Sequence, residues 1–505
     1  AGLMSVLALA SRIVGLLRDR LLASEFGASE SLDVYLAAFR IPDFIFNILV
    51  LGALSAAFVP IFTKFISHQQ NQEAWRFTNT ILNSMVIALI IIGVPLFLFA
   101  KHIMSLVAPG LSSEARELAG SLTQIMLLSP IFFGISNIAG SVLQSYKKFF
   151  LYSLAPILYN LGIIFGILFL VPRFGVYGLA WGVVLGAFIH MLVQLPSMFK
   201  FGWRYQPQVN MEQPGVIALF RLMGPRTFSL IIGQLNLIII TAIASFLSSG
   251  SISIFNFANN LQSVPVGVIG ISFAVAAFPF LAESSAKDNN LEYIAHFAKT
   301  FRQILFFIIP LSVMMFLLRA QIVRLTLGSG EFDWEATVLT LDTLAFFCIG
   351  LLAQCLAPLL VRSFHTLSDT KTPLFVALIS LAANLLIAYP LARIFGVAGL
   401  AFAFSLASIL QALILFILLR LRLGDLKDRD LLACLFRVSI STMISALVCY
   451  GLLYVLASVL NTRTVIGLLL QTAGAFLGAA LVYFAYHRWL KTDEFTELTN
   501  RNLAK

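Results

Sequence analysis

The sequence predicts an all-α polytopic membrane protein with about fourteen transmembrane helices. Of its 505 residues, 60% are hydrophobic and only 11% are charged, and the mean hydropathy is +0.95. A soluble domain carries roughly 25% charged residues, so this chain has too much apolar surface for water. Apolar runs of about 20 residues, enough to cross about 30 Å of hydrocarbon, recur along the whole chain. A membrane β-barrel would show short alternating strands instead.

Fourteen runs are apolar enough and long enough to be membrane spans. The first, at residues 2–23, contains Arg12 and lacks a basic leader and a cleavage site, so we expect a membrane helix rather than a signal peptide. The others are expected near residues 32–58, 79–100, 120–145, 153–172, 176–198, 217–248, 254–282, 300–318, 341–364, 374–393, 397–420, 434–459 and 464–489.

The loops between these spans differ in charge. With the N-terminus inside, the even-numbered loops hold many basic residues, whereas the opposite loops hold acids such as Glu114, Glu331 and Asp333. Cytoplasmic loops are enriched in Lys and Arg, so we expect both termini in the cytoplasm. The net charge of +10 then reflects topology, and we expect no nucleic acid as a partner. The basic residues of the even-numbered loops are Lys64, Arg76, Lys147, Lys148, Lys200, Arg204, Lys287, Lys299, Lys371, Arg420, Arg422, Lys427 and Arg429.

The chain also contains an internal repeat. AAFVPIF at 56–62 corresponds to AAFPFL at 276–281, and residues 173–200 resemble residues 394–420. Six spans fit in each copy, and an even number keeps both copies in the same orientation. We therefore expect two pseudo-symmetric six-helix lobes, related by an axis along the membrane normal. The expected parts are an N-terminal lobe at 1–200, a C-terminal lobe at 217–421 and two extra C-terminal spans at 434–490.

Prolines interrupt the second and the eighth span, which occupy matching places in the two lobes. They are Pro42 and Pro60 in the first lobe and Pro265 and Pro279 in the second. Broken helices at matching positions of two halves indicate the binding site of a transporter. Kinks that serve packing alone remain the alternative.

Spans 1, 2, 7 and 8 carry polar residues on one face. A spacing of seven residues, or of three and four, places side chains on the same face of a helix. We interpret the four stripes as the lining of one central cavity. They contain Ser5, Arg12 and Asp19 in span 1, Asp33, Arg40 and Asn47 in span 2, Thr227, Gln234, Thr241 and Ser248 in span 7, and Asn256, Asn259, Asn260 and Ser263 in span 8.

The charged side chains inside these spans need a polar environment. A charge at the middle of a bilayer costs about 2.5–3.5 kcal/mol, so Arg12, Arg18, Asp33 and Arg40 should not face lipid. They either form internal ion pairs, such as Arg12 with Asp19 or Arg40 with Asp33, or line a wet cavity that binds an anion. Arginine suits a diphosphate because its planar fork makes two parallel, charge-assisted hydrogen bonds.

The motifs of several enzyme classes are missing. The sequence contains no GxxxxGK[ST] phosphate loop, no loop long enough for a nucleotide-binding domain and no HExxH zinc motif. We therefore expect neither an enzyme nor an associated ATPase subunit.

Several segments resemble a known family. SRIVGLLRDRLLASEFGASESLDVYLAAFRIPD at 11–43, followed by GALSAAFVPIF, resembles the N-terminal signature of the MurJ (MviN) family. Residues 234–281 resemble the start of that family's second half, and SDTKTP at 368–373 resembles its loop between spans 10 and 11. The resemblance implies a flippase for lipid II, the undecaprenyl-diphosphate-linked peptidoglycan precursor, in a bacterial inner membrane. It also implies the multidrug/oligosaccharidyl-lipid/polysaccharide exporter superfamily, alternating access and a lipid-tail groove at spans 13 and 14.

The resemblance also suggests site residues. Arg12, Arg18, Asp33 and Asp43 fall where the family keeps functional polar groups. Many members have an arginine and a glutamate where this chain has Phe46 and Leu51, and an Asp-Arg pair where it has Asn259 and Asn260. A sodium site in the second half is also implied, with Asn236 and Asn384 as candidate ligands. Together with the stripes, the predicted substrate-binding set is Arg12, Arg18, Asp33, Arg40, Asp43, Gln234, Asn256, Asn259 and Asn260.

The expected function is therefore lipid II flipping by a monomer that contacts membrane lipids and needs no cofactor. Without an ATPase, the drive would be the membrane potential or a sodium or proton gradient, worth about 2.3 kcal/mol per charge per 100 mV. An exporter of another polyprenyl-diphosphate-linked glycan shares the same diphosphate chemistry and remains an alternative. So does a cation-coupled drug exporter of the same superfamily, although the excess of arginine disfavours cationic substrates. A membrane scaffold would not need four matched polar stripes.

Overall fold

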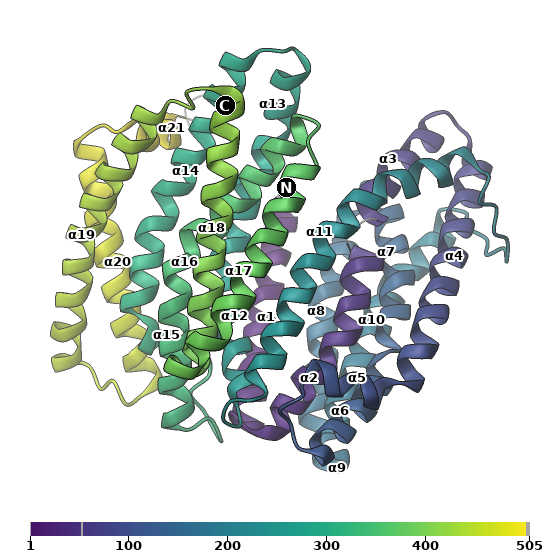
Figure 1. Ribbon diagram of the computed structural model, residues 1–505, viewed down its shortest axis with the longest axis horizontal. Coiled ribbons are helices and arrows are strands. Elements are labelled where there is room, and N and C mark those ends of the chain that lie inside the picture. The colour runs from purple at the N-terminus through teal and green to yellow at the C-terminus, as the bar shows by residue number, and fades with distance from the viewer. Residues whose placement is uncertain (1, 52–53, 501–505) are drawn as a thin grey trace. The chain divides into compact units, whose positions relative to one another are not determined.

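The structure is a computed structural model that describes residues 2–51 and 54–500 (Figure 1). Within these ranges the chain is helical and no strand is present, which fits a bilayer, where each backbone N–H and C=O must be paired inside its own segment. Eleven helical segments of the described chain are long and apolar enough to cross a membrane. They match the predicted spans other than 1, 2 and 7. The all-α polytopic class is confirmed, and the count of fourteen stays a prediction.

The chain forms two compact units. Unit 1 extends to Ser253 and includes Ser329–Asp333, whereas unit 2 comprises Ile254–Gly328 and the chain from Trp334 onward. The last helix of unit 1 is α11, most of which falls in the range predicted for the second lobe. It packs against α3 and α2. The helices of unit 1 are α1 (Gly2–Phe26), α2 (Glu30–Ile45), η1 (Phe46–Leu51), α3 (Leu54–Ser67), α4 (Asn71–Leu98), α5 (Ala100–Val107), α6 (Ser113–Met126), α7 (Ser129–Ser145), α8 (Phe149–Phe165), η2 (Gly166–Leu170), α9 (Val171–Phe174), α10 (Tyr177–Lys200) and α11 (Pro214–Ala244).

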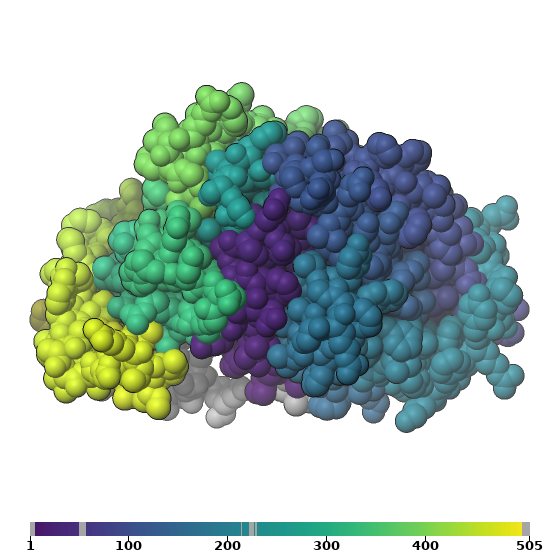
Figure 2. All heavy atoms as spheres, turned by 90° about the horizontal axis from the view of Figure 1, so that it is seen from below, coloured from purple at the N-terminus to yellow at the C-terminus, as the bar shows by residue number. Residues whose placement is uncertain are grey.

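Unit 2 contains the remaining helices, and α12 begins just before its boundary. The two C-terminal membrane helices, α19 and α20, pack against each other, and α19 packs on α14 (Figure 1). In the space-filling view the yellow C-terminal helices lie against the green segment that contains α15 (Figure 2). The helices are α12 (Ser251–Pro265), η3 (Val266–Ile271), α13 (Ser272–Ala286), α14 (Asn290–Leu317), α15 (Arg319–Thr326), α16 (Trp334–Thr366), α17 (Lys371–Phe395), α18 (Val397–Leu423), α19 (Asp428–Val459), α20 (Val465–Trp489) and α21 (Asp493–Asn500).

Small residues allow two helices of unit 1 to touch backbone to backbone. A Cβ added to Gly162 on α8 would overlap the backbone of Gly186 on α10, and one added to Gly166 would overlap Gly182. Helices in lipid associate through such close packing of small residues, because lipid chains are as apolar as leucine. The α8–α10 contact therefore gives a rigid support to the charged helix α1, which packs on α8.

Two of the four predicted interruptions are followed by π-helical segments, whereas Pro60 and Pro279 lie inside the helices α3 and α13. After Pro42 the chain continues from α2 into η1, and after Pro265 it continues from α12 into η3. A π-helical turn widens the helix at the cost of regular hydrogen bonding and is common at functional sites. The two segments begin 220 positions apart, at residues 46 and 266, which is the offset between residues 56 and 276 in the repeat.

Candidate functional site

Arg18 on α1 is held by partners on two helices of unit 1. Its Nε and Nη2 donate to Asp19 Oδ1 at 3.0 and 2.7 Å, and its Nη1 donates to Asn160 Oδ1 on α8 at 3.0 Å. The Arg18 side chain keeps 23% of its surface exposed, whereas Asp19 keeps 7%. A guanidinium fixed at several nitrogens is oriented before any ligand arrives, so it can present its open edge to an anion at little further entropic cost.

Asp33, in the first turn of α2, binds the start of α12. Gly250 N donates to its Oδ2, and Ser253 N and Oγ donate to its Oδ1, each at 2.8 Å. The first N–H groups of a helix have no partner within that helix, and a carboxylate there also opposes the helix dipole. Asp33 therefore caps α12, and it makes these bonds instead of the alternative ion pair with Arg40.

Glycines let loops of unit 1 meet around this cap. Gly250 has φ +88°, and a Cβ at this position would overlap the carbonyl of Ala28 in the loop between α1 and α2. Gly330, with φ +60°, likewise lies directly against the backbone of Ser24. The Glu331 N–H donates to the Ser24 carbonyl at 2.9 Å. These contacts close one end of unit 1 with backbone against backbone.

Arg40 lies two turns further along α2 and contacts α11. Its Nε donates to Thr241 Oγ1 at 2.8 Å, and that hydroxyl donates in turn to the Leu237 carbonyl. Asp43 follows one turn later, and Asn47 donates through Nδ2 to its backbone carbonyl at 2.8 Å. Polar groups of α2 thus continue from the capped end of the helix to the π-helical segment.

The rest of the predicted set is distributed over both units. Arg12 on α1 and Gln234 on α11 are half-buried in unit 1. Asn256, Asn259 and Asn260 are half-buried on α12 in unit 2, and Asn259 Oδ1 accepts a hydrogen bond from Gln262 at 3.1 Å.

Two positions where the chain departs from the family pattern lie on η1. Phe46 packs on Phe133 of α7 with ring centroids 4.6 Å apart, so an apolar contact stands where the resemblance implied an arginine. Leu51 ends η1. The side chains of Leu51 and of Ser5, in the stripe of span 1, lie outside the described part of the structure.

Sequence reasoning missed two partners of the charged groups. Asn160 holds Arg18, and Ser253 holds Asp33. Asn160 is the one amide in the apolar helix α8, whose other polar side chains are Ser153 and two tyrosines, so no periodicity marked it. An isolated polar residue inside a membrane span is expected to have a partner, however, and that signal would have selected it. Thr241, which holds Arg40, was part of the predicted stripe of span 7.

A sodium ion is a hard cation and takes several oxygen ligands. Asn236 is half-buried on α11 in unit 1, and Asn384 is buried on α17 in unit 2. In the described part of the chain, no three His, Cys, Asp or Glu residues lie close enough to hold a metal ion. Sodium binding by Asn236 and Asn384 therefore stays a prediction, and no step of the proposed function depends on it.

Comparison with known families decides the identity of the chain. Residues 22–473 match the model of the family described as lipid II flippase MurJ. The chain belongs to the MurJ family. It is 32% identical to a lipid II flippase MurJ of Burkholderia cenocepacia over 82% of each chain. It is 29% identical to a probable lipid II flippase MurJ of Thermotoga maritima over 97% of this chain and 96% of that one. The resemblance found in the sequence is confirmed, and the family is one of transporters rather than enzymes.

Solved structures agree with this assignment. The fold is similar to that of a structure titled lipid II flippase MurJ, inward closed conformation, with a TM-score of 0.79 and 26% identity, covering 97% of this chain and 100% of that one. A multidrug resistance MATE family transporter of the MOP superfamily is similar with a TM-score of 0.68 over 83% of this chain and 96% of that one. At 17% identity, the second match shows a shared fold alone.

Proposed function

We propose that the protein is a lipid II flippase of a bacterial inner membrane. It moves the headgroup of an undecaprenyl-diphosphate-linked peptidoglycan precursor from the cytoplasmic to the outer leaflet. The observation that carries this proposal is the pre-oriented guanidinium of Arg18, held by Asp19 and Asn160 inside the first span of a MurJ-family chain. Membership of the family supplies the substrate class, and the arginine supplies the chemistry that a diphosphate needs.

Positive charge for the headgroup comes from α1 and α2. Arg12, Arg18 and Arg40 lie on these helices, whereas the matching helix α12 offers asparagines. A guanidinium fork fits two oxygens of a phosphate, and the attraction strengthens when water is excluded. We assign Arg12, Arg18 and Arg40 to the diphosphate, and Asp43, Gln234 and the asparagines of α12 to uncharged parts of the headgroup. Asp33 acts by positioning the start of α12.

The closed end of unit 1 is assigned to the outer gate of an alternating-access cycle. If both termini are cytoplasmic, α1 and α11 run outward, and the loops around Ala28, Gly250 and Gly330 lie on the outer side. Their backbone contacts then block the outer exit. This assignment is supported by the similarity to a MurJ structure titled inward closed. Outward opening would require the bonds from Gly250 and Ser253 to Asp33 to break.

The lipid tail is assigned to the C-terminal helices. A cavity of about 150 Å³ lies between η3, α14 and α20, and apolar side chains such as Phe307, Leu311 and Phe476 line it. Apolar walls at this place allow the tail to stay in hydrocarbon while only the headgroup crosses. The two lobes of the internal repeat, at 1–200 and 217–421, would move relative to each other around the headgroup.

The energy source is assigned to the membrane potential or to a sodium or proton gradient, with no cofactor, and the working form to a monomer. Replacing external sodium by potassium at constant membrane potential removes the sodium gradient, so a loss of flipping would identify sodium as the energy source.

Topology can be tested by labelling single cysteines at Ser67 and Ser113, both exposed, with a membrane-impermeant thiol reagent. The cysteine at position 67 should react from the cytoplasmic side and that at 113 from the outer side. Labelling of both from one side would overturn the orientation.

Rescue of a bacterium depleted of its own lipid II flippase tests the function directly. The parent chain should restore growth and cell-wall synthesis, and Arg18→Ala at an equal membrane level should not. In a parallel assay, purified protein in liposomes should expose labelled lipid II to an external quencher. Failure of the parent in both assays would contradict lipid II as the substrate. Transport of another polyprenyl-diphosphate-linked glycan in the liposome assay would then favour the alternative exporter.

A further inference from the structure

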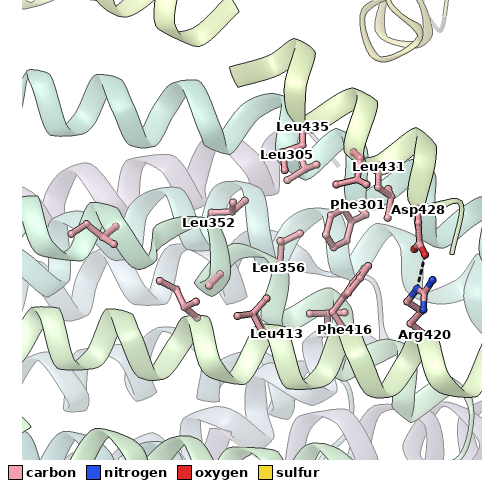
Figure 3. A pocket seen from close by; sticks show the side chains of 16 residues that line it. Phe301, Leu305, Leu352, Leu356, Leu413, Phe416, Arg420, Asp428, Leu431 and Leu435 are labelled. Atoms are coloured by element: carbon pink, nitrogen blue, oxygen red, sulfur yellow. Dashed lines mark hydrogen bonds and ion pairs between the residues drawn. The ribbon is translucent and has the colours of Figure 1, made fainter. Parts of the chain in front are cut away.

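A second apolar cavity, of about 620 Å³, lies in unit 2 between α14, α16, α18 and α19. Figure 3 shows Leu305, Leu356 and Leu413 facing the cavity from α14, α16 and α18, with Phe301 and Phe416 nearer the end that holds Arg420 and Asp428. None of its lining residues belongs to the predicted headgroup site or to the cavity between η3, α14 and α20. The proposed flipping cycle therefore leaves this cavity without a role.

The length of the cavity corresponds to one leaflet of a bilayer. Its lining extends along α18 from Ile409 to Arg420, which at 1.5 Å per residue is about 16 Å. The hydrocarbon core of a bilayer is about 30 Å thick, so one leaflet contributes about 15 Å. A single acyl chain anchored at the surface of a leaflet would fill a cavity of this length.

One end of the cavity is charged. Arg420 Nε donates to Asp428 Oδ2 at 2.5 Å, and Figure 3 shows this pair at the end where Phe416 and Leu431 lie. The other carboxylate oxygen, Asp428 Oδ1, is buried and has no hydrogen-bond partner among the described residues. A buried acceptor without a donor is costly and calls for a ligand group that donates. The bond to Asp428 uses the Nε hydrogen of Arg420, and the guanidinium has four further hydrogens on its Nη atoms.

The geometry points to a binding site for a phospholipid with a primary ammonium headgroup, that is, a phosphatidylethanolamine. One acyl chain fills the cavity, the phosphate accepts hydrogen bonds from the Nη atoms of Arg420, and the ammonium donates to Asp428 Oδ1. The ordered pair of opposite charges complements the zwitterionic headgroup. A quaternary choline group has no N–H to give Asp428, and phosphatidylglycerol has the phosphate but lacks the ammonium that would balance the charge of that carboxylate. The site rests on the membrane setting of the chain and not on the identity of the transported lipid.

Lipid binding to the purified, delipidated full chain tests the inference. Phosphatidylethanolamine, phosphatidylcholine and phosphatidylglycerol with the same acyl chains are added separately, and bound lipid is counted by native mass spectrometry. The parent should bind phosphatidylethanolamine at least about tenfold more tightly than the other two, the difference expected from one charge-assisted hydrogen bond. Asp428→Asn should remove most of this preference. Ala412→Phe, which fills the cavity without touching the charges, should weaken binding of all three lipids.

The matched control is Arg422→Gln, because Arg422 also lies on α18 but pairs with Asp369 and does not line the cavity. It should bind lipids as the parent does, whereas Arg420→Gln should bind phosphatidylethanolamine more weakly. Equal binding of the three lipids by the parent, or an unchanged preference in Asp428→Asn, would overturn the inference. Phosphatidylethanolamine binding that survives Ala412→Phe would overturn the assignment to this cavity. None of these measurements involves flipping, so the outcome is independent of the rescue experiment.

Discussion

The helices α2 and α12 occupy the same place in the two copies of the internal repeat, yet they carry different chemistry. Each ends in a π-helical segment, and the two segments begin at residues 46 and 266. At the same offset of 220 positions, Arg40 corresponds to Asn260 and Asp43 corresponds to Ser263. The repeat has therefore kept the broken backbone in both copies and the charge in only one. In the proposed function, the negative charge of the headgroup is met by the arginines of the first copy, and the matching positions of the second copy are neutral.

The comparison also explains the cap on α12. Asp33 and Ser253 are equivalent positions of the repeat, 220 residues apart, and they bind each other directly. The first copy supplies the carboxylate of Asp33, and the second supplies the N–H and hydroxyl of Ser253 at the start of α12. The contact therefore depends on a difference between the two copies at this position.

The largest expected effect comes from Arg18, in the copy of the repeat that carries the positive charges. Arg18→Ala should abolish rescue of a flippase-depleted strain, because truncating one partner of a desolvated, hydrogen-bonded charge pair costs about 2–5 kcal/mol. Arg18→Lys should restore only part of the activity, since a point charge lacks the fork that binds two phosphate oxygens. Growth and membrane levels should be measured together. Full rescue by Arg18→Ala at the parental membrane level would contradict the role of this helix.

The next effect compares the equivalent positions Arg40 and Asn260. Arg40→Ala should slow flipping at least about thirtyfold in liposomes, by the same charge-pair argument. Asn260→Ala should slow it about tenfold or less, because it removes a neutral hydrogen bond worth roughly 0.5–1.5 kcal/mol. The order of the two rates is the decisive readout. A larger loss at Asn260 than at Arg40 would mean that α12, and not α2, makes the main contact with the headgroup.

A smaller effect is expected at the cap. Asp33→Ala should leave the N–H groups of Gly250 and Ser253 without an acceptor, and their amide hydrogens should exchange with solvent faster. Ser253→Ala removes only the hydroxyl bond and should cost about 1 kcal/mol or less. Exchange at Gly110, whose N–H is bound by Ser245 at 2.9 Å, serves as the internal reference. If the Gly250 amide of Asp33→Ala exchanged as slowly as in the parent, Asp33 would not be needed to hold the start of α12.

The sequence was sufficient for the features that depend on local pattern. Long apolar runs predicted the helices, and prolines at matching places predicted the breaks that η1 and η3 show. The charged residues of α1 and α2 stood out because charge inside a bilayer is costly wherever it occurs. These features need no knowledge of which helices are neighbours.

Partners were harder to predict, because they depend on contacts between distant parts of the chain. Nothing in the periodicity of α8 connects Asn160 to Arg18, which lies 142 positions earlier. The contact of Asp33 with Ser253 could have been found by aligning the two copies of the repeat at single-residue precision. The assignment of α11 by symmetry to the second lobe did not anticipate its packing on α2 and α3, because sequence symmetry says nothing about which neighbour a helix selects.

The smallest expected effect concerns the polar turn before the eleventh span. In the first copy this turn contains Lys147 with φ 58°, and in the second it contains Ser368 with φ 59°. Only the second has a carboxylate that closes the turn. Asp369 accepts bonds from the N–H groups of Lys371 and Thr372, from the Thr372 hydroxyl at 2.8 Å and from Arg422 at 3.0 Å.

Burial, the largest single influence, raises the pKa of Asp369, but the hydrogen bonds from Thr372 and the charge of Arg422 together lower it below its usual value. A carboxyl group with a lower pKa in the folded state stabilises the fold above the unfolded pKa, near 3.9, and loses this contribution as the pH falls through the folded value. Because the side chain of its partner Arg422 is 43% exposed, solvent screens the pair, and the contribution should be about 1 kcal/mol or less. The melting temperature of Asp369→Asn should therefore lie slightly below that of the parent at pH 7 and approach it below about pH 4. Arg422→Gln should reduce the same difference. A gap between Asp369→Asn and the parent that stays unchanged in acid would show that the bonds to Asp369 do not depend on its charge.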